Sequence, residues 1–179
     1  MENKVLSKPT DLESKVTHLS VSSCGNFVFS AHLSGHISKI NVQSGKERAK
    51  SKLCHQGPIS GIQTDSLNKY VVTIGSEDFS LKVWDFLTLR LLNSVLLKFT
   101  PLLICLNREN NLIALSNNKN QVVIIDLITL RTVREFNLMS KALSTCIRFS
   151  NDGQNVLVSM QDSSLKVFNL LSGNLIDWV

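Results

Sequence analysis

The stretch Leu81-Lys82-Val83-Trp84-Asp85-Phe86 has three counterparts in the chain, and together the four stretches decide the fold. The counterparts are Ile37-Ser38-Lys39-Ile40-Asn41-Val42, Val122-Val123-Ile124-Ile125-Asp126-Leu127 and Leu165-Lys166-Val167-Phe168-Asn169-Leu170. In each stretch an apolar residue precedes Asp or Asn, which precedes another apolar residue. Those first apolar residues (Ile40, Trp84, Ile125, Phe168) lie 44, 41 and 43 residues apart. A fixed period of this length is typical of repeat architectures.

Each repeat predicts four short antiparallel strands. A β-rich run such as Tyr70 to Ile74 precedes every repeated stretch, and a turn such as Asn151-Asp152-Gly153-Gln154 precedes that run. Gly and Asn supply the positive φ that tight hairpins need. No segment carries a sustained apolar stripe of helical period. The expected units are 15–52, 53–97, 98–139 and 140–179, with residues 1–14 as an N-terminal extension or linking strand.

These units resemble WD40 blades, which are four-stranded and about 40–45 residues long. The expected fold is therefore all-β, with four WD40 β-propeller blades. Propellers close with about 4–8 blades, and WD40 rings are usually at the larger end. We therefore expect an arc of a larger propeller, whose exposed blade faces could support self-association.

The second repeat predicts a buried polar network within its blade. Asp78 lies six residues before Trp84, and His55 lies at the entry to the repeat. In WD40 blades the Asp accepts a hydrogen bond from the His, which reaches a hydroxyl and the Trp indole. Thr73 or Ser76 could supply that hydroxyl.

The other repeats keep less of this pattern. The fourth retains Asp162 and Ser159 but has no matching His, and we expect both residues in its structural network. The first and third have Ser34 and Lys119 at the Asp position. We therefore expect these two blades to be held by apolar packing alone.

Composition excludes several classes of protein. The 179 residues are 43% hydrophobic but only 18% charged, below the ~25% of typical soluble domains. The low share of charged residues suggests that part of the surface is covered and does not face solvent. No secretory signal follows Met1, and the apolar runs fall far short of the ~20 residues of a membrane helix. The four cysteines form no Cys-x-x-Cys pair. We expect an intracellular protein with reduced thiols and no membrane association.

Candidate chemistry is sparse, and the sequence predicts no catalytic, metal or cofactor site. The four histidines lack metal-ligand spacing, and no Gly-rich phosphate loop is present. Ser23-Cys24-Gly25 could suggest a cysteine nucleophile, but Cys24 falls at a hairpin tip. The protein is therefore not expected to be an enzyme.

One segment concentrates the positive charge. Residues 39–52 contain Lys39, Lys46, Arg48, Lys50 and Lys52 against Glu47, a net +4 out of the chain's +5. An extended strand would place the last four cations on one face, where they could meet phosphates. The alternative is a solvated edge strand that its charge protects from unwanted pairing, and the absence of interleaved aromatic residues favours it.

The order of the motifs resembles one family of WD-repeat subunits, that of the U3 small nucleolar ribonucleoprotein and small-subunit processome, assigned to the UTP-B subcomplex. The stretches that carry the resemblance are Ser23-Cys24-Gly25-Asn26-Phe27, Asn41-Val42-Gln43-Ser44-Gly45, Thr73-Ile74-Gly75-Ser76-Glu77, Val133-Arg134-Glu135-Phe136 and Ser172-Gly173-Asn174-Leu175-Ile176-Asp177. They run along nearly the whole chain.

The resemblance implies two tandem propellers and a helical C-terminal domain in such proteins, with this chain as the closing blades of the second propeller. It implies a non-catalytic scaffold for early 18S pre-rRNA processing in the nucleolus of the nucleus, with other processome proteins as partners and U3 RNA or pre-rRNA as a weak or indirect contact. It transfers no binding residue.

Two other functions stay open. One is a generic WD40 adaptor in another nuclear or cytosolic complex, although Trp84-Asp85-Phe86-Leu87 lacks the Arg of the usual Trp-Asp-x-Arg docking motif. The other is direct RNA binding through the basic strand at 46–52, which would depend steeply on salt.

Overall fold

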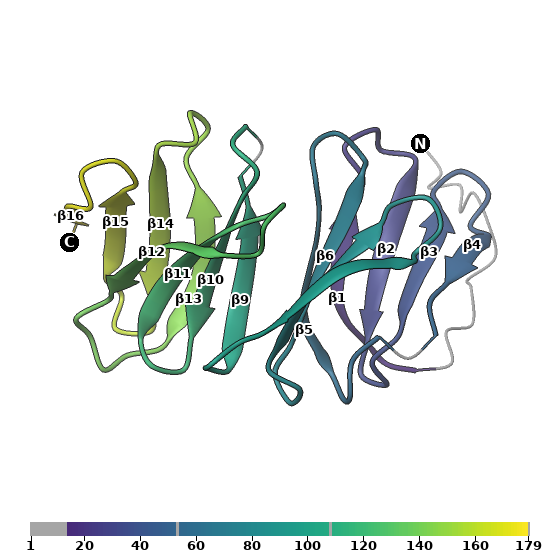
Figure 1. Ribbon diagram of the computed structural model, residues 1–179, viewed down its shortest axis with the longest axis horizontal. Helices are drawn as coiled ribbons and strands as arrows, with labels where there is room; N and C mark the ends of the chain where they lie inside the picture. The colour runs from purple at the N-terminus through teal and green to yellow at the C-terminus, as the bar shows by residue number, and fades with distance from the viewer. Residues whose placement is uncertain (1–13, 53, 108, 179) are drawn as a thin grey trace, which may run out of the picture. The chain divides into compact units, whose positions relative to one another are not determined.

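The protein is built from four antiparallel sheets. The computed structural model describes residues 14–52, 54–107 and 109–178, and these ranges contain sixteen strands and no helix (Figure 1). Each sheet has four strands. The prediction of an all-β chain with four four-stranded antiparallel units is confirmed. We call the sheets blades 1 to 4 in chain order.

The chain divides into two compact units, residues 1–94 and 95–179, with the division inside β8. Blades 1 and 2 belong to the first unit. Their strands are β1 (Val16–Val21), β2 (Phe27–His32), β3 (Ile37–Asn41), β4 (Glu47–Lys50), β5 (Ile59–Thr64), β6 (Tyr70–Gly75), β7 (Ser80–Asp85) and β8 (Leu91–Leu96).

Blades 3 and 4 belong to the second unit. Their strands are β9 (Pro101–Leu106), β10 (Leu112–Asn117), β11 (Gln121–Asp126), β12 (Thr132–Asn137), β13 (Ser144–Phe149), β14 (Asn155–Met160), β15 (Leu165–Asn169) and β16 (Leu175–Trp178). In every blade, strands that follow one another in the chain are neighbours in the sheet. The structure divides the chain into pairs of blades and does not test single blades as domains. We therefore still propose the four domain units 15–52, 53–97, 98–139 and 140–179. The predicted extension, residues 1–14, lies outside the described residues except for Ser14.

The repeated Asp or Asn shapes the turn between the third and fourth strands. Asp85 Oδ1 accepts backbone N–H bonds from Leu87 and Thr88 at 3.1 and 2.7 Å, and Asn169 Oδ1 accepts equivalent bonds. Such side-chain bonds stabilise a turn in place of backbone pairing. The fifth residue of each turn has a positive φ: Gly45 (62°), Leu89 (54°), Leu130 (54°) and Gly173 (76°). Every repeated stretch therefore ends a strand and begins a hairpin.

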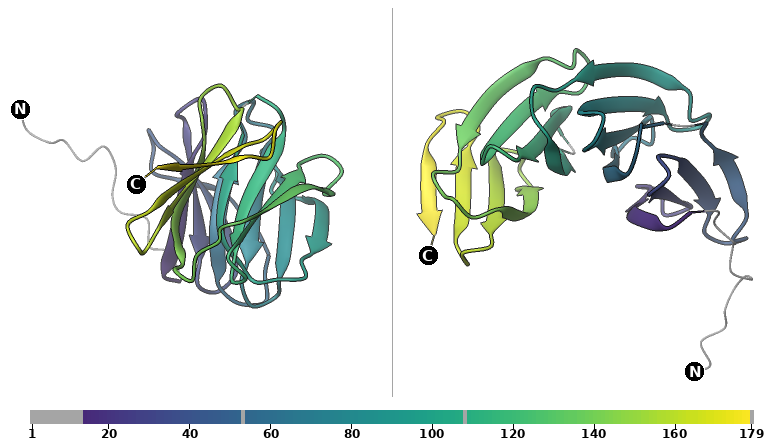
Figure 2. Two further views of the ribbon diagram at one scale, coloured as in Figure 1. Left: turned by 90° about the vertical axis from the view of Figure 1, so that its left-hand side faces the viewer. Right: turned by 90° about the horizontal axis from the view of Figure 1, so that it is seen from below.

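The two blades of each unit lie side by side (Figure 1 and Figure 2). An apolar core lies between them. In the first unit β1 and β2 contact β5, and in the second β9 and β10 contact β13. Side chains alternate along a strand, so one face of each blade points into this core. Phe29 and Trp84 belong to the first core, and Phe136 and Phe168 stack in the second with ring centroids 4.7 Å apart.

Candidate functional site

A chain of buried hydrogen bonds in blade 2 joins β6, β7, the turn between these two strands and a loop. The loop residue His55 approaches Asp78 through Nδ1, 2.9 Å from Oδ2, and Thr73 through Nε2, 2.8 Å from Oγ1. Trp84 Nε1–H donates to the same Thr73 oxygen at 2.9 Å. His55 and Thr73 are almost fully buried, at 1% and 0% exposure. The sequence offered Thr73 or Ser76 as the hydroxyl between His55 and Trp84, and the structure shows that it is Thr73.

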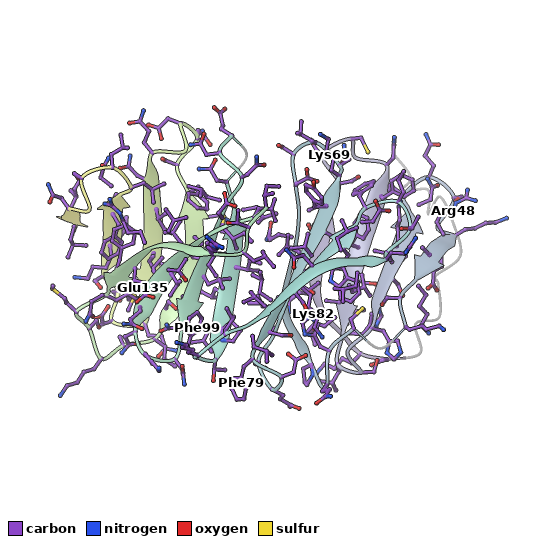
Figure 3. All side chains as sticks on the ribbon, in the orientation of Figure 1. Arg48, Lys69, Phe79, Lys82, Phe99 and Glu135 are labelled. Carbon is purple, nitrogen blue, oxygen red and sulfur yellow. The ribbon has the colours of Figure 1, made fainter. Side chains whose placement is uncertain are left out.

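Two further side chains complete the network. Ser80 Oγ–H donates to Asp78 Oδ1 at 2.8 Å and also lies 3.0 Å from His55 Nδ1. Lys82, labelled in Figure 3, places Nζ 3.4 Å from Asp78 Oδ2 and donates to the Cys54 carbonyl. The repeat pattern did not predict Ser80 or Lys82 in this network, although their positions two and four residues after Asp78 could have indicated them.

The electrostatics fix the proton positions. Burial lowers the pKa of His55 and outweighs the opposing hydrogen bond and charge of Asp78. Burial alone would raise the pKa of Asp78, but hydrogen bonds from His55 and Ser80 lower it to about 2. At neutral pH a neutral His55 therefore donates from Nδ1 to the Asp78 carboxylate and accepts from Thr73 at Nε2. Each polar side chain of this network therefore forms a hydrogen bond with another group within blade 2.

Blade 4 keeps only part of this arrangement. Asp162 accepts hydrogen bonds from Ser140 Oγ at 2.9 Å and Ser164 Oγ at 2.6 Å. Ser140 lies 22 residues before Asp162, as His55 lies 23 before Asp78, so a serine takes the position of the histidine. Asp162 is exposed, and these bonds form at the surface.

Ser159 does not join Asp162, which corrects the expected grouping. In both blades the residue at the Thr73 position pairs with the lysine two residues before the aromatic side chain, and in blade 4 that residue is Val158. Ser159 follows by one residue, so it points to the opposite face of the sheet. There its hydroxyl lies 2.8 Å from Thr145 Oγ1.

Blade 1 has a buried histidine of its own, which corrects the expectation of apolar packing alone. His32 Nδ1 donates to the Ser14 carbonyl at 3.0 Å, and Nε2 lies 2.9 Å from Ser30 Oγ. Register places Ser30 at the position of Thr73 and His32 at that of Gly75. The histidine therefore reaches the hydroxyl from within the strand instead of from a loop.

Gly75 shows that the two arrangements exclude each other. A Cβ added to Gly75 would overlap Asp78 Oδ1 and His55 Nδ1. Blade 2 therefore needs a glycine where blade 1 has a histidine.

Blade 3 also contains a buried polar side chain. Asn117 is 1% exposed, and its Oδ1 accepts N–H bonds from Lys119 and Gln121 at 2.9 and 3.0 Å. This amide shapes the turn after β10. Apolar packing is therefore supplemented by polar contacts in this blade too.

Lys39, expected as an RNA or partner contact, is buried. It is 4% exposed, and its ammonium donates to the Phe86 carbonyl at 2.9 Å. Nζ lies 4.3 Å from the Phe27 ring centroid and 4.5 Å from that of Phe86. The prediction that it faces a ligand was wrong, because alternation in β3 turns it into the core between blades 1 and 2. Burial lowers the pKa of its ammonium.

The other basic residues, Lys46, Arg48, Lys50 and Lys52, are exposed. They do not continue one extended strand, because β4 covers only Glu47–Lys50 and its pairing with β3 shifts at Arg48 (labelled in Figure 3). Ala49 pairs with Lys39 and Glu47 with Ile40, so Arg48 is the extra residue of a bulge. The expected one-sided row of cations is interrupted there.

Metal-binding groups are absent from the described ranges: no three His, Cys, Asp or Glu side chains in residues 14–52, 54–107 and 109–178 are placed to hold a metal ion. The same ranges contain no helix with the length and apolar character to span a membrane. The four cysteines are free, and Cys24 lies in the turn between β1 and β2.

A cavity of about 410 Å³ opens between blades 3 and 4. Val133 and Arg134 of β12 form one wall, and the turns of blade 4 at Gly153 and Leu171 form the other. Leu112 and Ile124 are also among its lining residues. No motif in the sequence indicated it, because its walls come together only when the two blades pack.

Comparison with known proteins gives matches along the whole chain. A family model described as the WDR36/Utp21 second beta-propeller domain matches residues 1–179. WD repeat-containing protein 36 of Homo sapiens is 33% identical over 175 residues, which are 95% of this chain and 19% of that protein. U3 small nucleolar RNA-associated protein 21 of Saccharomyces cerevisiae is 31% identical over 164 residues, 92% of this chain and 17% of that protein. The chain thus spans about a fifth of the length of these relatives.

Two solved β-propellers share the fold at low sequence identity. The beta-propeller domain of Cps50 (Swd1) from Myceliophteria thermophila is 14% identical with a TM-score of 0.83, covering 94% of this chain and 56% of that chain. U3-55K is 12% identical with a TM-score of 0.83, covering 94% of this chain and 53% of that chain. The predicted β-propeller fold is confirmed.

Proposed function

Because the chain belongs to the family of the WDR36/Utp21 second beta-propeller domain, we propose that it acts as a non-catalytic protein-interaction scaffold in a U3 small nucleolar ribonucleoprotein and small-subunit processome. In this role it supports 18S pre-rRNA processing and ribosome biogenesis in the nucleolus. The observation that carries the proposal is the family match over residues 1–179, together with a relative whose name states association with U3 small nucleolar RNA.

The structure supports a scaffold through the way it uses its polar side chains. His55, Asp78 and Thr73 satisfy one another inside blade 2, where they hold the strands and the loop together. Active sites instead direct perturbed titratable groups into a cleft. The nine described residues that line the cavity include no His, Cys, Asp or Glu, so these residues supply none of the usual acid, base or nucleophile side chains.

The outer faces of blades 1 and 4 support the proposal of an arc within a larger propeller. Leu19 and Val21 on β1 are 61% and 60% exposed, and register places them on the face of blade 1 opposite Phe29. Ile176 on β16 is 46% exposed, on the face of blade 4 opposite Phe168. Apolar blade faces need a neighbour, which would be further blades or a second copy of the chain.

Affinity purification tests the scaffold role. The protein is tagged at its own gene, purified from its own cells, and the bound RNA and proteins are identified. We expect enrichment of U3 RNA and processome proteins over a tagged WD40 protein from another complex, and nucleolar fluorescence of a tagged copy. Recovery of a stable set of other proteins without U3 RNA would instead support a generic WD40 adaptor.

Direct RNA binding is a second candidate, favoured by the exposed cations Lys46, Arg48, Lys50 and Lys52. Phosphate contacts would make the affinity fall steeply with salt. The triple variant Lys46→Glu, Arg48→Glu and Lys50→Glu should then lose RNA association measured by filter binding. Unchanged association would reject this candidate and leave the scaffold role untouched.

A further inference from the structure

The cavity between blades 3 and 4 has the size and composition of a ligand site. Its volume of about 410 Å³ falls within the range of ~300–1,000 Å³ that binding pockets occupy. All of its described lining residues belong to the second unit, so packing between the two blades of that unit creates it. The described lining residues include Leu112, Ile124, Val133 and Leu170, which make its surface mostly apolar.

The mouth of the cavity exposes apolar side chains. Leu171 is 81% exposed and Val133 is 58% exposed, although both line the cavity. Leu171 lies in the turn between β15 and β16, and Val133 lies on β12, the last strand of its sheet. Large apolar residues left in water on both sides of one opening mark a surface that another molecule covers.

Arg134 gives the cavity its charge. Among the described lining residues it is the one charged side chain, and it is half-buried on β12. Its Nη1 donates to the Leu171 carbonyl at 3.2 Å, which holds the guanidinium across the mouth. A Cβ added to Gly173 would lie 2.9 Å from Nη1, so the turn of blade 4 lies directly against this group.

The guanidinium has donors to spare. It carries five N–H donors, and the described residues show one hydrogen bond from it. Carboxylates bind such a planar group through two parallel hydrogen bonds, and partial burial strengthens them. As the one charged side chain among the described lining residues of a mostly apolar pocket, Arg134 therefore selects a ligand with one acidic group beside apolar groups.

We infer that this cavity docks a short linear peptide of a partner protein, in which an Asp or Glu side chain binds Arg134 and a neighbouring large apolar side chain enters the pocket. The inference deepens the proposed scaffold role and rests on it, since it assigns the chemistry of one partner contact. The apolar anchor fills the space beside Leu112 and Ile124, and the peptide covers Val133 and Leu171.

A phage-displayed library of random linear peptides, selected against the full chain, tests the inference. We expect the selected peptides to be enriched in an acidic residue adjacent to Leu, Ile, Phe or Met. Synthetic copies should bind the Arg134→Glu variant at least about tenfold more weakly, because the variant replaces a charge-assisted pair with like charges. The exposed Leu171→Ser variant should also bind more weakly.

Two variants serve as matched controls. Arg131→Glu makes the same charge change at an exposed arginine outside the cavity, and Ile128→Ser removes an apolar residue that is 54% exposed in the neighbouring turn. Both should bind the peptides as the unchanged protein does. If Arg134→Glu fails to fold by thermal unfolding, Arg134→Gln and Val133→Ser replace it.

Three results would overturn the inference. The first is that selected peptides lack acidic residues. The second is that they bind the Arg134 and Leu171 variants unchanged. The third is that single-stranded RNA, and no peptide, competes at these residues. If U3 RNA is recovered with the Arg134→Glu variant while peptide binding is absent, the docking site is rejected and the scaffold role stands. If peptides bind as expected but no U3 RNA is recovered, the scaffold role is rejected and the docking site stands.

Discussion

Blades 2 and 4 fill the same position with Trp84 and Phe168, yet they stabilise their strands by different interactions. In blade 2 the indole N–H of Trp84 ends a chain of buried hydrogen bonds that starts at Asp78. In blade 4 the ring of Phe168 stacks on Phe136 of the neighbouring blade, and the hydrogen bonds of Asp162 lie at the surface. Both aromatic side chains thus pack in a core between blades, but blade 2 adds a chain of internal polar bonds that blade 4 lacks among its described residues.

The largest expected effect comes from removing the aromatic side chains. Trp84→Ala and Phe168→Ala should each lower the free energy of unfolding by about 3–5 kcal/mol, because both leave large cavities. Trp84→Phe, which gives blade 2 the residue of blade 4, should cost less, since most of the volume remains. Urea unfolding measures all three. Equal losses for Trp84→Ala and Trp84→Phe would show that the indole hydrogen bond, and not packing, dominates in blade 2.

The hydroxyl of Thr73 should come next. Thr73→Val leaves His55 Nε2 and Trp84 Nε1 without their shared partner in a buried site, so we expect a loss of about 1–3 kcal/mol in urea unfolding. Ser159→Ala in blade 4 is the comparison, and it should change stability far less because its bond to Thr145 is partly exposed. A larger loss for Ser159→Ala would contradict the difference between the blades.

The pH dependence of stability should divide the blades in a similar way. The lowered pKa of His55 means that the unfolded chain takes up this proton first, so stability falls as the pH drops through the ordinary value of 6.5. Asp78, with its pKa lowered to about 2, adds a second loss as the pH falls from 3.8 toward that value.

Urea titrations across the acid range test both steps. Asp78→Asn should remove the lower one, whereas Asp162→Asn, at the exposed equivalent in blade 4, should change the profile less, because solvent screens the hydrogen bonds that lower the pKa of Asp162. Identical profiles for the two variants would mean that the buried carboxylate has no special weight.

The smallest expected effect concerns Lys39, the one buried cation among residues 14–52, 54–107 and 109–178, which lies in the core between the blades of the first unit. Lys39→Met keeps the length of the side chain and removes both the charge and its desolvation cost, so the change should stay within about 1.5 kcal/mol. Lys69→Met, at an exposed lysine labelled in Figure 3, is the control for the loss of one charge. Thermal unfolding compares the two, and a much larger loss at Lys39 would show that its attraction to the Phe27 and Phe86 rings exceeds the cost of burial.

The sequence predicted the four sheets because the repeated turn depends on local chemistry. Asp85 and its counterparts cap their own hairpins, so the signal lies within a few residues of the effect. Which face of the sheet a given side chain points to is harder to predict, since a shift of one residue moves it to the other face. That shift separates Ser159 from Asp162, and the same alternation buries Lys39. The cavity at Arg134 depends on two blades meeting, for which no short stretch carries a signal.

The clash between a Cβ at position 75 and His55 has a consequence for how such repeats diverge. Blade 1 has its histidine in the strand at His32, whereas blade 2 has it in the loop at His55. A histidine placed at position 75 of blade 2 by a single substitution would clash with His55. Loss of His55 alone would leave the Thr73 hydroxyl without its hydrogen-bond acceptor. Passage between the two forms therefore needs paired changes, so neighbouring blades keep different arrangements around the same hydroxyl position.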